Sequence, residues 1–301
     1  MATIAFLLPF ITLEYHLYVL STAFIIAGVS IAWNIMGGFC GQVSFGHAAF
    51  FGVGAYVSAI LSVDWNLPPI LTVPIGTVAA LILAGAIGIP CFRLRGAYFA
   101  LAMLAIAEIL RLVCINWVEV THGPAGVYGI PPFSQVIGTS RRANYFIVLI
   151  ILMVTVYISY LISKSRYGLA FRSILNDELS AEVSGVNTFK MKMLACIISA
   201  ALTGLFGAIY AHYMYYIDPQ TVFGIKYSLL PIATTLFGGI NTVAGPLLGA
   251  VSLILLDEYV FRPIFPGLHE FIYGAVLLIV ILFMPNGIAG SLKSIWSIKR
   301  K

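Results

Sequence analysis

Long uninterrupted apolar runs occupy most of this sequence. A run of about 20 apolar residues is long enough to cross the hydrocarbon core of a bilayer as a helix. A helix is favoured there because it satisfies every backbone N–H and C=O group within itself. The runs lie at about 17–36, 43–62, 69–90, 97–117, 143–163, 193–216, 227–240, 244–261 and 268–284.

These runs predict an all-α integral membrane protein, a polytopic bundle of about 8–10 transmembrane helices with broken or re-entrant segments. We expect one transmembrane domain to fill residues 1–301. Spanning β-strands would instead alternate in polarity over segments of about ten residues. Only 9% of the residues are charged, against about a quarter in soluble domains, which excludes a water-soluble fold. The run at 227–240 is short for a full crossing and fits a re-entrant helix, and 3–13 fits an extra half-helix.

The distribution of Lys and Arg predicts how the chain crosses the membrane, because cytoplasmic loops carry an excess of these residues. Alternating spans place eleven of them on the side of segment 164–192 and four on the other side, with Arg111 inside the bilayer. Segment 164–192 is therefore expected in the cytoplasm, while the side of Met1 stays open. The eleven are Arg93, Arg95, Lys164, Arg166, Arg172, Lys190, Lys192, Lys293, Lys299, Arg300 and Lys301, and the four are Arg141, Arg142, Lys226 and Arg262.

Segment 165–192 concentrates charge that the rest of the chain lacks, with seven of the 27 charged residues in 28 positions. From Asn176 to Ser184 there is no Pro or Gly, and Asn176 is a suitable N-cap with acidic residues in the following turn. Gly185 suits a left-handed helix stop. We expect a short helix outside the bilayer. A solvated loop, whose charges only fix the topology, is the alternative.

The same segment resembles the cytoplasmic loop of the permease subunits of branched-chain amino acid ABC importers. That loop has roughly the pattern S-R-x-G-x-A-x-R-A-I-x-x-x-E-x-A-A-x-x-x-G-I-x-x-x-x-x-K. The chain departs from it mildly at Ser173, Ser180 and Val186. The matching residues are Ser165, Arg166, Gly168, Ala170, Arg172, Ile174, Glu178, Ala181, Gly185 and Lys190.

The resemblance implies that this segment contains a coupling helix, which docks into a cleft on a cytoplasmic ATPase subunit. It extends to the stretches at 37–56, 121–132, 237–250 and 283–290, which are similar to family motifs in the same order. Ala125 and Val127 are less typical, and Asn241 stands where the family has Gly. The residues that the resemblance assigns to ATPase coupling are Gly168, Arg172, Asp177, Glu178, Ala181, Glu182, Gly185 and Lys190.

Two glycine-rich segments, 37–56 and 237–249, interrupt apolar runs in the two halves of the chain. Non-helical backbone at membrane depth survives only where protein or a water-filled cavity surrounds it. Paired interruptions of this kind indicate a transport site between the two halves, here by analogy with secondary transporters. Close helix packing is the alternative, and we favour it for most of the glycines. The residues that we expect along a translocation pathway are Gly41, Gln42, Ser44, Gly46, His47, Gly238 and Gly239.

Other polar residues fit structural roles. Glu108 and Arg111 lie three apart on one expected helix, a spacing that favours an ion pair. Asp257 and Glu258 close a span and fit the outer membrane interface, and Asp218 fits an external turn that contacts a partner. The remaining residues of interest, for which the spacing indicates neither a metal site nor a disulfide framework, are His16, His122, His212, His269, Cys40, Cys91, Cys114 and Cys196.

The sequence has no G-x-x-x-x-G-K-[ST] motif, so it lacks the phosphate-binding loop of an ATPase. We therefore expect no catalytic residue and no cofactor on this chain, with ATP and Mg on separate ATPase subunits. The resemblance implies a permease for branched-chain or related amino acids in a bacterial or archaeal cytoplasmic membrane. It also implies four kinds of contact: a second homologous permease subunit, two ATPase subunits, an external solute-binding protein and membrane lipid. The net charge of +5 is small for a nucleic-acid partner.

Three alternatives remain at this point. The same family includes permeases for urea, short amides and other amino acids. An ion-coupled secondary transporter would need a buried carboxylate, for which Glu108 is the main candidate. A membrane-embedded enzyme would need a His/Asp/Glu or Cys/His constellation at a span end, and the sequence shows none.

Overall fold

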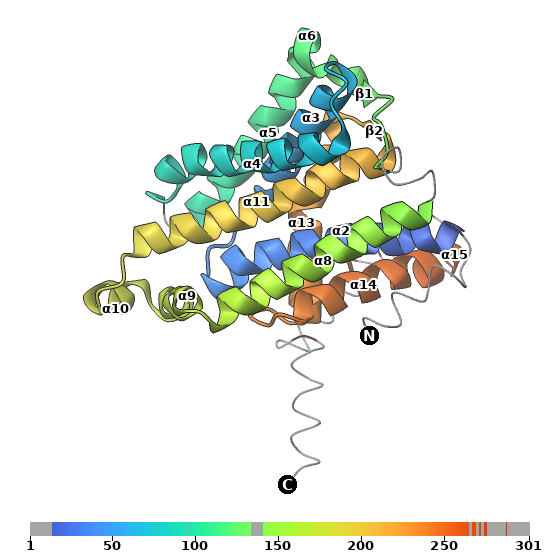
Figure 1. Cartoon of the computed structure of the whole chain (residues 1–301). Coiled ribbons are helices and arrows are strands. Elements are labelled where there is room, and N and C mark those ends of the chain that lie inside the picture. Colours follow the sequence, from blue (N-terminus) through green and yellow to red (C-terminus); the bar gives the residue numbers. More distant parts are fainter. Residues whose placement is uncertain are drawn as a thin grey trace.

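The computed structural model describes residues 14–94, 96–133 and 141–264, together with positions 267, 268, 271, 274, 275 and 287. The described chain is almost entirely helical, as predicted (Figure 1). The expected half-helix at 3–13, most of the run at 268–284 and the basic tail lie outside the described residues. Five described helices are long and apolar enough to cross a membrane: Glu14–Phe39, Pro69–Cys91, Ala97–Asn116, Arg142–Lys164 and Thr188–Met214.

Helix α2 (Glu14–Trp33) is the centre of the bundle, and it continues into a π-helical turn, η1 (Asn34–Phe39). Apolar residues lie on every side of this helix, and most of its residues are buried. A helix of this kind needs protein on every side. The helices that pack on α2 are α8 (Arg141–Lys164), α11 (Thr188–Met214), α13 (Lys226–Gly238) and α14 (Gly245–Leu256).

Small residues bring a second group of helices together: α3 (His47–Val63), α4 (Pro69–Cys91) and α11. A Cβ atom added at Gly54 would lie 2.1 Å from the carbonyl oxygen of Gly204, and one at Gly207 would lie 2.0 Å from that of Phe51. Neither site has room for a side chain. These contacts show the close backbone approach that small residues allow between membrane helices.

The two ends of the bundle carry different elements (Figure 1). Helices α9 (Arg166–Asn176) and α10 (Glu178–Val183) lie at one end, between α8 and α11. At the opposite end, α5 (Ala97–Asn116) is followed by α6 (Val118–Thr121) and a 3-10 turn, η2 (Gly123–Ala125). Strand β1 (Val127–Tyr128) then pairs antiparallel with β2 (Tyr216–Ile217). The segments expected inside and outside thus lie at opposite ends.

A short hairpin completes the described fold after α12 (Pro219–Val222). Helix α13 has 13 residues, about 20 Å, which is short of the roughly 30 Å hydrocarbon core. Its partner α14 is extended by a π-helical turn, η3 (Asp257–Phe261), and by α15 (Arg262–Ile264). Lys226 at the start of α13 and Arg262 at the start of α15 line one cavity, so this hairpin begins and ends at the same end of the bundle.

Candidate coupling and translocation site

The charged segment forms two short helices. The second, α10, confirms the expected short helix, but the expected cap at Asn176 is wrong. Asn176 is the last residue of α9, and Asp177 is the N-cap of α10. The extended backbone of Asp177 separates the helices, and its Oδ1 accepts a hydrogen bond from the backbone N–H of Ser180 at 2.5 Å. This bond holds the pKa of the Asp177 carboxyl below its usual value. Gly185 has a φ of +86°, the left-handed conformation that the sequence predicts there.

The buried face of this segment packs directly on the interrupted helix. Phe171 and Ile174 of α9 and Ala181 of α10 belong to one buried cluster with Phe39 and Cys40, where α2 ends. Val243, from the second glycine-rich segment, packs against the same cluster. The segment expected to couple to an ATPase, including Ala181, therefore shares a close-packed interior with both interruptions. Such interiors transmit displacement because they have few voids to absorb it.

Two acidic residues that we expect to take part in coupling connect α10 to the start of α11. Glu178 forms an ion pair with Lys192 at 2.5 Å, and the Lys192 side chain is only 8% exposed. Glu182 accepts a hydrogen bond from the Thr188 hydroxyl at 2.7 Å. At the start of α9, a Cβ at Gly168 would lie 2.2 Å from the Ile162 carbonyl oxygen, so the turn from α8 is tight. These residues position the segment within the chain.

The outward face of the segment carries both charge and apolar surface. Arg172 and Lys190 are exposed. Leu179 is 63% exposed and Val183 is 90% exposed. The two apolar residues lie four apart in α10 and so share one face of the helix. Sequence reasoning missed them, although their spacing within a polar segment was visible.

The first glycine-rich interruption lies beside α9. After η1 the backbone is irregular up to Gly46, and Gly41 has a φ of +74°. A Cβ at Gly41 would lie 3.0 Å from Cδ1 of Leu175 in α9. The Nε2 of Gln42 donates to the Cys40 carbonyl at 3.5 Å, a long hydrogen bond that remains near the chain's own backbone. This places Gly41 and Gln42 at the end of the bundle that carries α9 and α10.

Ser44, Gly46 and His47 are held by contacts within the protein. The Ser44 hydroxyl accepts from the backbone N–H of Gly46 at 3.2 Å, and both Ser44 and His47 are fully buried. Nε2 of His47 lies 2.8 Å from the Ser199 hydroxyl. That hydroxyl donates to the Ala32 carbonyl at 2.7 Å, so it accepts from Nε2–H of His47. His47 therefore links α3, α11 and α2 in this conformation.

The second interruption separates α13 from α14. Gly239 has a φ of +122°, and a Cβ at Gly238 would lie 1.8 Å from the Gly245 carbonyl oxygen. The two helix backbones are in direct contact here, which only glycine permits. Asn241 follows with a φ of +65°. Asn tolerates the left-handed region better than other non-glycine residues, which explains how it replaces the Gly that the family motif has.

One side chain joins the two interruptions. The Nδ2 of Asn34, in η1, donates to the Thr242 carbonyl at 2.9 Å. Its Oδ1 accepts from the backbone N–H of Asn241 at 3.2 Å. One turn earlier in α2, the hydroxyls of Ser30 and Thr234 lie 2.7 Å apart. We call these four residues, Ser30, Asn34, Thr234 and Asn241, the α2–α13 seam.

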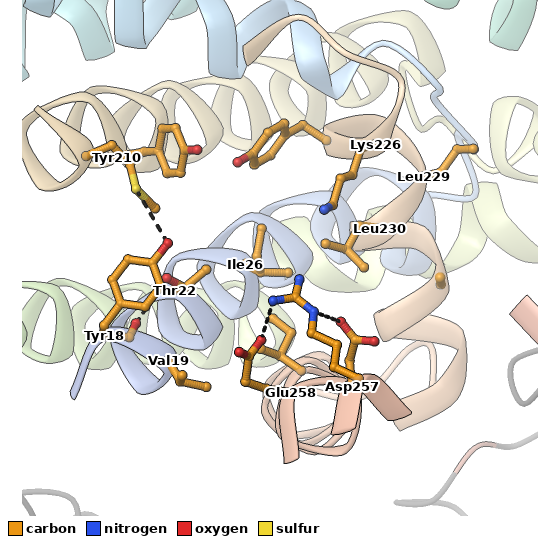
Figure 2. Close-up of a pocket in the computed structure, with 15 residues that line it drawn as sticks. Tyr18, Val19, Thr22, Ile26, Tyr210, Lys226, Leu229, Leu230, Asp257 and Glu258 are labelled. Carbon is orange, nitrogen blue, oxygen red and sulfur yellow. Dashed lines mark hydrogen bonds and ion pairs between the residues drawn. The ribbon is translucent and has the colours of Figure 1, made fainter. Parts of the chain in front are cut away.

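A cavity of about 580 Å³ opens at the other end of this seam, between α2, α11, α13 and η3. Figure 2 shows Lys226 on one wall and Asp257 and Glu258 on the facing wall. Arg262 pairs with both carboxylates, at 2.8 Å to Glu258 and 3.6 Å to Asp257. Sequence reasoning assigned the two carboxylates to the membrane interface and missed the cavity. None of the seven expected pathway residues lines it.

The remaining polar expectations resolve into structural contacts. Arg111 pairs with Glu108, as predicted, with Nε–Oε2 at 2.8 Å. It also donates to Gln220 at 2.8 Å, which ties α5 to α12. Asp218 caps α12 by accepting from the Thr221 N–H at 2.9 Å. Within the described ranges, His, Cys, Asp and Glu form no group suited to a metal ion.

The fold and the site define a class: a multi-pass helical membrane protein in which a charged segment between two spans packs onto two broken helices, as in a transporter subunit. Residues 15–281 match the family described as branched-chain amino acid transport system / permease component. The chain belongs to this family of ABC-type permeases. It is a multi-pass protein of a bacterial or archaeal cytoplasmic membrane and, as a permease component, has no catalytic role.

Relatives from bacteria and an archaeon cover most of the chain. The high-affinity branched-chain amino acid transport system permease protein LivM of Escherichia coli (strain K12) is 24% identical over 89% of this chain and 68% of its own length. The corresponding LivH is 25% identical over 87% of this chain and 90% of its own length. A probable LivM of Methanocaldococcus jannaschii is 21% identical over 86% and 89%, respectively. No solved structure matches the chain.

Proposed function

We propose that this permease carries branched-chain or related amino acids inward, as one transmembrane subunit of an ATP-driven importer. An external solute-binding protein delivers the amino acid, and a second homologous permease subunit completes the membrane-spanning part. Two cytoplasmic ATPase subunits bind ATP and Mg, and this chain holds no cofactor. The relatives LivM and LivH are named as permease proteins of a branched-chain amino acid transport system, which supports this substrate class.

The proposal rests mainly on one feature of the packing: α9 and α10 share a buried cluster with residues of both glycine-rich interruptions. Helix α9 contacts η1, and Phe171 and Ile174 share one buried cluster with Phe39, to which Val243 of the 239–244 loop also belongs. A push on α9 and α10 would therefore displace the inner ends of α2 and α13 together. In this mechanism the ATPase supplies the push and the permease converts it into a change in which side its interior faces.

The outward face of α10 is the proposed contact with the ATPase. Leu179 and Val183 present apolar surface to the cytoplasm, and Arg172 lies on the adjoining helix. Burial of two aliphatic side chains would contribute about 1.5–3 kcal/mol each. Asp177 and Gly185 define the ends of α10, while Glu178, Ala181 and Glu182 anchor its inner side. The proposed roles of the sequence-assigned residues thus divide between docking and anchoring.

The pathway residues would act when the inner end opens. In the described conformation Ser44 and His47 are fully buried, and Gly238 contacts Gly245. We propose that displacement of α9 separates these contacts and exposes the backbone of the two interruptions to the passing solute. Glu108 is unsuited to ion coupling because Arg111 already neutralises it. Transport of urea or short amides is the alternative substrate choice.

The test is uptake by the assembled importer. Proteoliposomes that contain this chain, its permease partner and the ATPases receive the purified binding protein outside and ATP inside. We expect saturable uptake of L-leucine that requires both ATP and the binding protein. Uptake of urea or acetamide with no leucine uptake would replace the substrate assignment. Leucine uptake by this chain alone, without ATPase subunits, would contradict the proposed mechanism.

A further inference from the structure

The outer cavity has the size and lining of a small-molecule site. Its volume of about 580 Å³ falls within the roughly 300–1,000 Å³ of known ligand pockets. Ile26 of α2, Leu230 and Ala233 of α13 and Ile254 of α14 form an apolar wall on the inner side. Such sites combine apolar walls with a few polar groups that fix the orientation of the ligand.

The charged groups gather on two walls of the cavity, with Lys226 on α13 and Asp257 and Glu258 at the end of the facing helix (Figure 2). Arg262 also lines the cavity. Two cations and two anions leave the cavity without formal net charge. Arg262 is held by the carboxylates of Asp257 and Glu258. Lys226 takes part in no ion pair among the residues that the structure describes, and its side chain is exposed. Its ammonium group is therefore available to an anionic group of a ligand.

The carboxylates retain capacity to bind a cation as well. An ionised carboxylate offers about four lone-pair sites. Arg262 contacts one oxygen of Asp257 and one of Glu258, and the Tyr15 hydroxyl donates to the other oxygen of Glu258, so each carboxylate keeps lone pairs for a further donor. Their side chains are 23% and 17% exposed, respectively, and both line the cavity. Oδ1 of Asp257 is buried and has no hydrogen-bond partner among the described residues. The hydroxyl groups of Tyr18 and Tyr227 add neutral polar groups to the same cavity. An ammonium group entering from the outer end would meet acceptors there.

We propose that this cavity is the outer binding site for the transported solute, and that it selects a zwitterion with an aliphatic side chain. The ligand carboxylate pairs with Lys226, the ligand ammonium group approaches Asp257 and Glu258, and the aliphatic part lies against Ile26 and Leu230. A neutral cavity matches a neutral zwitterion, whereas a purely anionic or cationic ligand would leave one wall unpaired. This inference rests on the proposed function.

The position of the cavity supports this assignment. Thr22 and Ile26 of α2 line it, and Ser30 and Asn34 follow at the same four-residue spacing on the same face of the helix. The cavity therefore borders the α2–α13 seam, in which the hydroxyls of Ser30 and Thr234 lie 2.7 Å apart. A solute bound in the cavity would lie at one end of the α2–α13 seam, and the two glycine-rich interruptions lie at its other end.

The test compares Lys226→Met with Lys226→Arg in the reconstituted importer, with L-leucine as the probe. Lys226→Met keeps the length of the side chain and removes its charge, whereas Lys226→Arg keeps the charge. We expect Lys226→Met to lower leucine uptake at limiting concentration by about tenfold or more, the scale of one charge-assisted hydrogen bond. Lys226→Arg should retain most of the uptake. Glu119→Gln, an exposed charge on α6 at the same end, is the matched control and should leave uptake unchanged.

The outcomes separate this inference from the function on which it rests. Co-purified ATPase and ATPase activity without binding protein should be the same in all variants, which shows that assembly is intact. Unchanged leucine uptake in Lys226→Met would overturn the cavity assignment and leave the function standing. Absence of leucine uptake in the unaltered importer would overturn both. Equal loss in Lys226→Met and Lys226→Arg, with assembly intact, would also count against a charge-specific site.

Discussion

Asn34 and Asn241 lie 207 positions apart in the sequence and are joined by a hydrogen bond of 3.2 Å, from the backbone N–H of Asn241 to Oδ1 of Asn34. The same side chain donates to the Thr242 carbonyl, so it satisfies both a donor and an acceptor of the 239–244 loop. Each half of the bundle contributes one interrupted helix, and this amide connects them. Together with the contact between the hydroxyls of Ser30 and Thr234, this buried side chain helps to set their relative position.

Replacement of Asn34 by Leu should destabilise this junction. The change keeps the approximate shape of the side chain but leaves the Asn241 N–H and the Thr242 carbonyl without their partner. An unsatisfied buried polar group costs about 1–3 kcal/mol. We expect a lower midpoint of thermal unfolding in detergent and reduced uptake. Asn116→Leu is the control, because Asn116 is exposed and bonds only within its own helix, to Leu112. Equal midpoints for both variants would contradict the assignment.

We expect the fold to tolerate Gly at position 241 and to be destabilised by Val. Its φ of +65° is left-handed, a conformation that costs a residue other than Gly about 1–2 kcal/mol. Asn241→Gly should therefore leave the unfolding midpoint unchanged or raise it. Asn241→Val should lower it, because β-branched residues fit this conformation poorly. The measurement is again thermal unfolding of the purified chain. A stable Val variant would show that the backbone of this loop adapts freely.

Val183→Asp should disrupt the contact with the ATPase and spare the fold. Val183 is 90% exposed, so the change disturbs no buried contact of the chain. A charge placed in an apolar docking surface should reduce co-purified ATPase by about tenfold or more. Val118→Asp provides the control, since Val118 is 59% exposed on α6 at the other end of the bundle. If both variants retain the ATPase equally, α10 does not form the contact.

The Glu178–Lys192 pair should show strong coupling between its partners. Lys192 is buried, so Glu178→Gln leaves an uncompensated buried charge. We expect a loss of about 1–3 kcal/mol in unfolding free energy, less than for a fully buried pair because Glu178 is 35% exposed. The double variant Glu178→Gln/Lys192→Met should recover much of this loss. A double-mutant cycle measured by thermal unfolding checks it, and additive effects would argue against the pair.

Acid should loosen α10 through Asp177. Its pKa is lower in the folded chain than in an unfolded one, because the Ser180 N–H binds the carboxylate. The capping contribution is therefore complete above the ordinary Asp pKa and is lost as pH falls through the lowered value. A spin label at position 183 should become more mobile over that acidic range. Asp177→Asn keeps a capping oxygen but does not titrate, so its label should respond less. An equal response would assign the change to another group.

The sequence was sufficient for the fold class and for the charged segment that separates two of the long apolar helices. The long apolar runs predict the membrane spans. The polar stretch from 165 to 192 differs clearly from them in composition. Gly185 and the Glu108–Arg111 pair were also predictable, because both depend on neighbours within a few positions. The cap at Asp177 was missed by one residue. Asn and Asp are equally good caps, so only the backbone turn between α9 and α10 decides between them.

Local sequence determined where this chain forms helices, which of them are apolar enough for a bilayer and which segment carries most of the charge between them. Those properties depend on hydropathy and on residues within a turn or two of each other. Only the tertiary structure decided that Asn34 meets Asn241, that α9 packs on η1 and that Lys226 faces Glu258 across a cavity. Each of these contacts joins residues that are far apart in the chain, and their geometry depends on how whole helices pack around α2.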